Sequence, residues 1–150
     1  MPRQPSPPVS ILPTAVPLAA LLAFLAAIPS ALRAEVTEVD SAALERLVEA
    51  GATVVDVRRE DEWRERGVLE GAHRLTFFDR RGGYDVEAWL AELAEIVEPG
   101  EPLVLICARG VRSKRIADFL DAKLGMRAVH NVTGGIERWR EDGGEIVSWP

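Results

Sequence analysis

The single cysteine of the chain, Cys107, follows an apolar run at residues 103–106 and opens a short loop with two arginines, Arg109 and Arg112. A loop that enters a helix N-terminus presents unpaired backbone N–H groups, and the helix dipole adds about half a positive charge there. Such a loop stabilises anions, so a Cys107 thiolate beside these arginines would act as a nucleophile near neutral pH. A lone cysteine is also commonly a small buried hydrophobe, so the elements around it must decide between the two interpretations.

The elements around Cys107 alternate between strand-like and helix-like patterns. Asp40 is a plausible N-cap for a helix that stops near Gly51, and residues 53–57 form a β-branched strand with Asp56 near its carboxyl end. Four or five such strands alternating with helices predict an α/β fold with a mainly parallel sheet and helices on both faces. Ligands bind beyond the carboxyl ends of such strands, where Asp56 and Cys107 both fall. The other expected elements are helices at residues 58–66, 86–97, 113–124 and 136–141, strands at 103–106 and 128–132, and a loop-rich stretch at 67–85 with an extended piece near 74–76.

Residues 1–34 have the pattern of a secretory signal peptide. Their apolar run, residues 15–28, contains 14 residues and Pro17, whereas a bilayer needs about 20 residues of helix. We expect cleavage after Ala34, which leaves one domain at residues 35–150. The alternative is a retained membrane anchor, which would place the same domain outside the cytoplasm at the membrane.

Export and charge restrict the partners of this domain. The formal net charge of the chain is −6 and becomes −8 without residues 1–34, which contain two arginines and no acid. This argues against a nucleic-acid partner, because phosphate binding needs a basic footprint. We expect the exported domain in the periplasm, where disulfides form, but its single cysteine has no disulfide partner in its own chain. Cys107 is therefore protected, catalytic, or paired with another molecule.

Several short motifs occur in one order along residues 36–147, and together they resemble the rhodanese domain, the fold of single-cysteine sulfurtransferases. The resemblance implies a rhodanese-like α/β fold. The matching pieces are Asp56-Val57-Arg58, Glu62-Trp63, Gly71-Ala72, the loop 107–113, Gly134-Gly135-Ile136 and Trp139.

The resemblance also implies a reaction. Cys107 would take the outer, sulfane sulfur from thiosulfate or a related persulfide donor and hold it as a persulfide. A thiol, cyanide, or a thiol of a partner protein would then accept it. No metal or organic cofactor is implied, and the scattered His73 and His130 make a poor metal site with one cysteine. The loop residues that would surround the persulfide are Ala108, Arg109, Gly110, Val111, Arg112 and Ser113.

Three other functions stay open. Related folds include phosphatases and arsenate reductases with a Cys-x5-Arg loop, but the spacing here is Cys-x4-Arg, with Ser113 at the next position, which favours sulfur over a phosphoryl group. A non-catalytic module could bind a partner through its acidic surface or through a lip at residues 77–83. A thiol redox or persulfide carrier would pair Cys107 with a thiol from another molecule.

The supporting residues each have two interpretations. Arg109 either contacts the substrate anion or is a solvated loop charge, and Arg112 is expected to turn to an acid or a helix end. Asp56 is expected to orient the cysteine loop by accepting backbone N–H bonds, with capping of its own turn as the alternative.

Arg58 either acts near the site or pairs with Glu62 at helical spacing. Gly134 and Gly135 would form a turn with positive φ, and Trp139 is expected to pack rather than contact substrate. One position departs from the family: Val68 stands where a histidine is usual, which puts the local hydrogen bonding in doubt.

Overall fold

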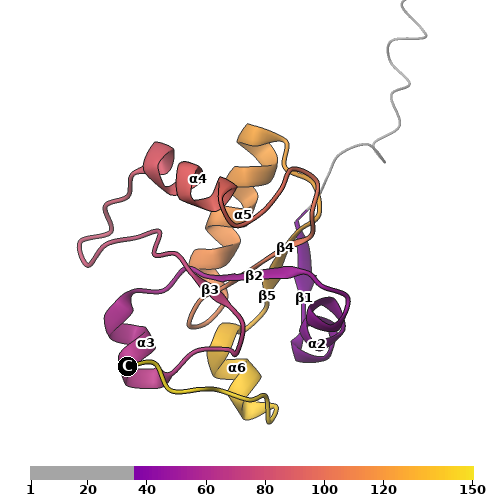
Figure 1. The fold of residues 1–150 in the computed structure, drawn as a ribbon, viewed down its shortest axis with the longest axis vertical. Helices are drawn as coiled ribbons and strands as arrows, with labels where there is room; N and C mark the ends of the chain where they lie inside the picture. The colour runs from indigo at the N-terminus through magenta and orange to yellow at the C-terminus, as the bar shows by residue number, and fades with distance from the viewer. Residues whose placement is uncertain (1–35) are drawn as a thin grey trace, which may run out of the picture. The chain divides into compact units, whose positions relative to one another are not determined.

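The computed structural model describes residues 36–150, in which strands and helices alternate along the chain (Figure 1). The signal-peptide or anchor prediction for residues 1–34 lies outside the described residues. Among residues 36–150, no helix has the length and apolar character needed to cross a membrane. The elements are β1 (Thr37–Val39), α2 (Ser41–Glu49), β2 (Thr53–Asp56), α3 (Glu60–Arg66), β3 (His73–Arg74), α4 (Val86–Ala94), β4 (Leu103–Ile106), α5 (Val111–Leu124), β5 (Val129–Val132) and α6 (Gly135–Glu141).

The five strands of the described domain form one sheet in the order β1-β5-β4-β2-β3, and every pair is parallel. The prediction of a four- to five-stranded, mainly parallel α/β sheet is therefore confirmed. Asp56 at the end of β2 lies in register with Ile106 at the end of β4. This register brings the Asp56 turn and the Cys107 loop to the same edge of the sheet.

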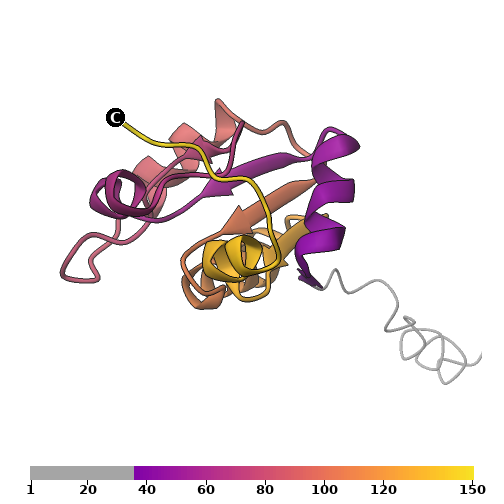
Figure 2. The ribbon, with the colours of Figure 1, turned by 90° about the horizontal axis from the view of Figure 1, so that it is seen from below.

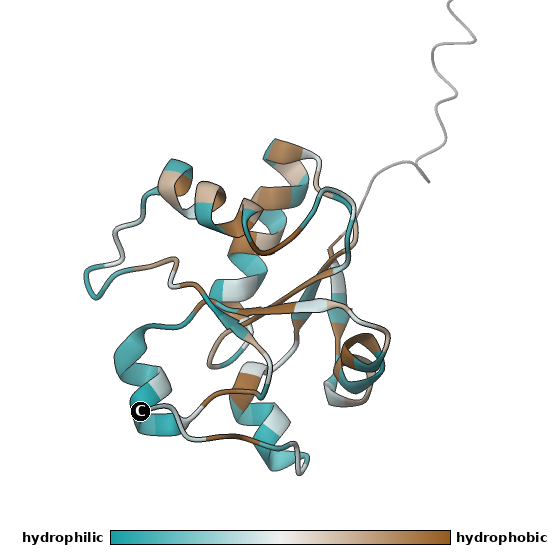
Figure 3. Ribbon diagram, viewed as in Figure 1, coloured by the Kyte–Doolittle hydropathy of each residue, from teal (hydrophilic) through white to brown (hydrophobic). Residues whose placement is uncertain are grey.

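Helices cover both faces of the sheet (Figures 1 and 2). Leu103 and Leu105 of β4 pack with α4 and α5 on one face, whereas Val104 and Ile106 pack with α2 and α6 on the other. All four side chains are fully buried, which explains why β4 reads as an uninterrupted apolar run. By contrast, α3 is largely hydrophilic, and Figure 3 shows it mostly in teal.

Helix boundaries differ from the predicted ones by a few residues, for local reasons. α3 begins at Glu60 rather than 58, because Arg58 is buried against Asp56. α5 begins at Val111, two residues earlier than predicted, because Gly110 takes a left-handed conformation (φ 81°, ψ −8°) that turns the chain directly into the helix. α4 ends at Ala94 rather than 97.

Candidate active site

Cys107 lies directly after the central strand β4 and is 1% exposed. The hydroxyl of Ser113, in the first turn of α5, donates a hydrogen bond to Cys107 Sγ at 3.3 Å. Ser113 is itself fully buried. Since a hydroxyl donor stabilises a negatively charged sulfur more than a neutral one, this contact favours the thiolate.

The carbonyl groups of the cysteine loop are held by α6. The N–H of Ile136 donates to the Cys107 carbonyl at 2.9 Å, and the N–H of Glu137 donates to the Ala108 carbonyl at 3.1 Å. In a planar trans peptide the N–H points opposite to the carbonyl, so the N–H groups of Ala108 and Arg109 are directed away from α6.

These loop amides are available to a ligand. Within residues 36–150, no backbone N–H from residue 108 to residue 113 has a hydrogen-bond acceptor in the protein. The last three of them, in the first turn of α5, are of the kind that a helix leaves unpaired at its start. Unpartnered amides grouped in this way next to a sulfur are of the kind that can stabilise an anion.

Two glycines permit this close arrangement. Gly110 (φ +81°) and Gly135 (φ +60°) both lie in the left-handed region, where other residues are strained. A Cβ at Gly110 would stand 2.7 Å from the Val132 carbonyl oxygen, and one at Gly135 would stand 2.6 Å from the Ala108 carbonyl. The predicted positive φ is found at Gly135 and at Gly134 (φ +78°).

Arg112 turns to an acid, as the sequence suggested, and that acid is Glu62 of α3. Two hydrogen bonds of 2.8 and 2.6 Å join them in a bidentate pair. Burial opposes ionisation of Glu62, but the bonds and charges of Arg112 and Arg59 outweigh it and lower its pKa to about 2. The hydrogen bond from Arg112 to Glu62 raises the pKa of Arg112, so Arg112 stays a cation within the loop that begins at Cys107 and adds positive charge near the sulfur.

The Glu62 pair predicts an acid-sensitive part of the stability. A carboxylate whose pKa falls from 4.5 unfolded to about 2 folded stabilises the protein above pH 4.5, and this contribution is lost as the pH falls towards 2. Because the pair is partly solvated, we expect about 1–2 kcal/mol. Urea unfolding at pH 6 and pH 3 should show a smaller loss for Glu62→Gln than for the unmodified protein. Equal losses in both proteins would contradict the prediction.

Asp56 and Arg58 form a fully buried ion pair, which corrects two expectations. The Asp56 carboxylate accepts the Arg58 backbone N–H at 3.0 Å and its side-chain Nη2 at 2.6 Å. It therefore caps its own turn, and within residues 36–150 it has no hydrogen bond to the cysteine loop. Arg58 is not paired with Glu62, because it precedes α3 and turns inward, where Nη2 also donates to the Gly67 carbonyl at 2.8 Å.

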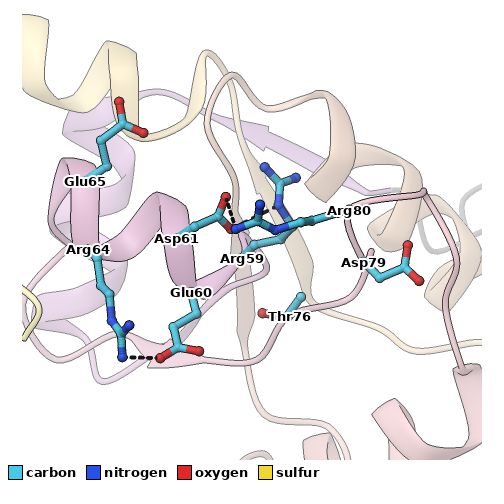
Figure 4. A pocket seen from close by; sticks show the side chains of 8 residues that line it. All are labelled: Arg59, Glu60, Asp61, Arg64, Glu65, Thr76, Asp79 and Arg80. Atoms are coloured by element: carbon cyan, nitrogen blue, oxygen red, sulfur yellow. Dashed lines mark hydrogen bonds and ion pairs between the residues drawn. The ribbon is translucent and has the colours of Figure 1, made fainter.

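Beyond the cysteine loop, a hollow of about 540 Å³ opens to solvent between α3, the loop and Glu137 of α6. It adjoins a second hollow between α3 and the turn at residues 76–80 (Figure 4). The arginines there are engaged with acids, as Figure 4 shows for Arg59 with Asp61 and for Arg64 with Glu60. Arg109, exposed at the loop, has no acidic partner among residues 36–150 and is free to meet an anion.

The remaining candidate residues pack in the core or lie at the surface. The Trp139 ring is buried in the core and its Nε1 donates to the Glu145 carbonyl at 2.9 Å, so Trp139 packs as expected. Val68 is 2% exposed. His73 is exposed, whereas burial lowers the pKa of His130. Within residues 36–150, no group of three His, Cys, Asp or Glu side chains is placed to hold a metal.

The lip at residues 77–83 is smaller than the sequence suggested. Phe77 is 8% exposed and packs edge-on against Trp89, so it belongs to the core. The turn itself is held by Asp79, whose carboxylate accepts the N–H groups of Arg81 and Gly83 at 2.7 Å each.

Sequence reasoning did not find two features of the site: the Glu62–Arg112 pair and the hold of α6 on the loop carbonyls. Glu62 was visible as part of a motif, but nothing local identified its partner 50 positions away. The α6 contacts involve backbone atoms, which leave no side-chain signature beyond the double glycine.

Loss of the Ser113 hydroxyl should slow the reaction of Cys107 with electrophiles. A hydrogen bond to a charged group contributes about 1.5 kcal/mol or more, so Ser113→Ala should react with iodoacetamide about tenfold more slowly at pH 7. At high pH, where the thiol ionises in both proteins, the difference should shrink. Pseudo-first-order alkylation rates across pH measure this, and an unchanged rate at pH 7 would show that the hydroxyl does not support the thiolate.

The fold and the site define a class of α/β domain with a parallel sheet. Its single thiol follows the central strand, in a loop of unpartnered amides that leads into a helix. Residues 40–142 match the model of the rhodanese-like domain, and the chain belongs to this family. The resemblance inferred from the motifs is thus confirmed.

Proteins similar to this chain support the family assignment. The chain is 30% identical over 109 residues to thiosulfate sulfurtransferase 18 of Arabidopsis thaliana, which covers 70% of this chain and 79% of that protein. It is 31% identical over 107 residues to the putative sulfurtransferase YtwF of Bacillus subtilis, covering 70% and 91%. Its structure is similar to a rhodanese-related protein from Thermoplasma volcanium, with a TM-score of 0.57, 29% identity, and coverage of 74% and 97%.

Proposed function

We propose that this protein is a sulfurtransferase that carries a sulfane sulfur on Cys107, with thiosulfate or a small persulfide as donor. The observation that carries the proposal is the placing of Cys107 Sγ against the Ser113 hydroxyl and beside a loop whose amides are unpartnered. Such a loop stabilises both a thiolate and the anionic outer sulfur of a persulfide. The sulfurtransferase names of the relatives from Arabidopsis thaliana and Bacillus subtilis support the same class of reaction.

The reaction has two steps. In the first, the Cys107 thiolate attacks the outer sulfur of thiosulfate, a new S–S bond forms, and the S–S bond of thiosulfate breaks with its electron pair leaving on sulfite. In the second step, cyanide or a thiolate attacks the outer sulfur and forms a bond to it. The bond between Sγ and the outer sulfur then breaks with its electron pair on Sγ, which releases thiocyanate or a new persulfide and regenerates the Cys107 thiolate. Neither step consumes an external oxidant or reductant, and we propose that neither needs a cofactor.

The burial of Cys107 fits a reaction in which the acceptor meets the outer sulfur of the persulfide and not Sγ itself. The outer sulfur of a persulfide extends about 2 Å beyond Sγ, which brings the reactive atom closer to the acceptor than the buried cysteine itself. Because the chain has no second cysteine, a thiol acceptor comes from another molecule. From the pattern of residues 1–34 we propose that this exchange takes place after export, in the periplasm or at the outer side of the membrane.

The pairing of Arg112 also supports sulfur rather than phosphoryl chemistry. In a phosphatase loop the arginine holds a tetrahedral oxyanion through its N–H groups, whereas two of the five N–H groups of Arg112, one on each terminal nitrogen, already bond Glu62. A persulfide needs only amide donors and a nearby positive charge.

The test is sulfur loading measured by intact mass. The purified protein, incubated with thiosulfate, should gain the mass of one sulfur atom and lose it on addition of cyanide, with thiocyanate released. Cys107→Ser should gain nothing. Absence of loading with both thiosulfate and a low-molecular-weight persulfide would overturn the proposal and favour a non-catalytic module.

Arg109 should contribute to binding of an anionic donor. It is the exposed cation next to the sulfur without an acidic partner in residues 36–150, so Arg109→Gln should raise the KM for thiosulfate about tenfold and change kcat little. Arg127→Gln, which removes another exposed arginine beyond the far end of α5, is the matched control and should behave as the unmodified protein. If both variants behave alike, Arg109 is a solvated loop charge.

A further inference from the structure

The last six residues of the chain, 145–150, form a segment that we call the C-terminal strap. Val147 in the strap and Val68, just after α3, exchange two backbone hydrogen bonds of 2.9 Å each in an antiparallel bridge. The approach at this point is close, because a Cβ at Gly67 would stand 2.7 Å from the Val147 carbonyl oxygen. Arg64 Nε also donates to the Pro150 carbonyl at 3.3 Å. The strap therefore lies against α3 and the residues that follow it, as Figure 1 shows for the C-terminus.

Trp149 is the main side chain of the strap. Its ring meets that of Trp63 edge to face, with centroids 6.4 Å apart, and the Arg74 guanidinium lies 3.8 Å from its ring centroid. The buried Nε1 atom of Trp149 has no hydrogen-bond partner among the described residues. The ring, rather than the N–H group, therefore makes the contact.

The position of α3 depends strongly on this contact, because α3 has little other apolar packing. It has seven residues, too few to be stable without packing, and Trp63 is its one buried side chain. The other six residues are charged, which is why α3 is teal in Figure 3. The ring of Trp149 thus packs on the single apolar anchor that holds α3 to the domain.

α3 in turn reaches the cysteine loop at two points. Glu62 holds Arg112, in the first turn of α5, through two hydrogen bonds. Arg66 pairs with Glu137 at 2.8 Å, and the N–H of Glu137 holds the Ala108 carbonyl. A shift of α3 would therefore move the Arg112 cation in the cysteine loop and one of the links that orient that loop.

We propose that the C-terminal strap, through the ring of Trp149, is a positioning element of the sulfur site: it fixes α3 so that Glu62 holds Arg112 beside Cys107. The inference rests on Cys107 as the reactive group of the proposed function, but not on the identity of the sulfur donor or acceptor. It can be tested without sulfur transfer.

The test compares alkylation of Cys107 by iodoacetate, an anion, and by iodoacetamide, its neutral counterpart. The ratio of the two rates reports positive charge near the sulfur, because access and the thiolate fraction affect both reagents alike. Trp149→Ala should lower this ratio at least threefold in the full chain. Trp149→Phe, which keeps one aromatic ring to meet Trp63 but loses the second ring and the unpartnered N–H, should restore most of it. Leu90→Ala, on α4 at the opposite face, controls for general loss of stability and should leave the ratio unchanged.

A double-variant cycle separates positioning from a merely structural role. In an Arg112→Gln background the ratio should no longer respond to Trp149→Ala, because the cation through which the strap acts is gone. Two outcomes would overturn the inference: an unchanged ratio in folded Trp149→Ala, or an equal fall with Arg112 present and absent. If sulfur loading fails but this ratio behaves as expected, the proposed function is rejected and the inference about the strap still holds.

Discussion

Replacing Asp56 with alanine should lower the free energy of unfolding by about 3–5 kcal/mol, the typical loss when one partner of a buried ion pair is removed. Both side chains of the Asp56–Arg58 pair are fully buried. Without the carboxylate, the Arg58 guanidinium stays in the interior with one remaining hydrogen bond, to the Gly67 carbonyl. Its Nη1 atom already lacks a partner among residues 36–150, so little is left to balance the charge.

The loss should come from the unpaired charge rather than from the missing carboxylate. Removing both charges together, as Asp56→Leu with Arg58→Met, should therefore recover a large part of the stability that Asp56→Ala loses, because apolar pairs of similar volume replace buried ion pairs well. Urea unfolding of the three proteins at pH 7 measures this. If Asp56→Ala lowers the free energy of unfolding by less than about 1 kcal/mol, water reaches Arg58 and the ion pair is not shielded from solvent.

The order of the elements and the position of the sulfur could be predicted from the sequence because their signals are local. Strands buried on both faces read as apolar runs, as at residues 103–106, and Asp40 caps α2 as expected by accepting the Ala43 N–H at 2.8 Å. The same holds for Gly134 and Gly135, where the double glycine indicates positive φ. These features depend on a few neighbouring residues and on nothing across the fold.

The partners of charged residues could not be predicted in this way. Arg58 lies four positions before Glu62, which suggests a helical pair, but the helix begins after Arg58 and the side chain turns to Asp56 instead. Glu62 is then free for Arg112, and only the pairing of β2 with β4 brings these two residues together. Spacing along the chain cannot show which helix end lies beside which strand.

The strap is the clearest case of a feature without a sequence signal. Residues 145–150 have no helical or strand periodicity, and Trp149 could pass for an exposed terminal aromatic. Its contact with Trp63 joins the end of the chain to a helix more than 80 positions earlier. Such contacts depend on the path of the chain across the finished domain.

Replacing Gly135 with alanine should reduce the rate of sulfur loading at least about a hundredfold, because a methyl group there would occupy the place of the cysteine loop. The added Cβ would lie 2.6 Å from the Ala108 carbonyl carbon and close to the Cys107 carbonyl oxygen. Both are backbone atoms, which cannot move aside as a flexible side chain can. Either α6 or the loop must shift, and the hydrogen bonds from Ile136 and Glu137 that direct the loop amides are lost.

Strain from the backbone conformation must be separated from this collision, and Gly125 offers the matched control. It ends α5 with φ +63°, close to the +60° of Gly135, but a Cβ there would meet nothing within 4 Å. Gly125→Ala should therefore lose about 1 kcal/mol of stability and load sulfur at the normal rate. Loading rates by intact mass and unfolding curves for both variants give the comparison. If Gly135→Ala loses no more loading activity than Gly125→Ala, α6 does not position the cysteine loop, and the loop alone holds the amides in place.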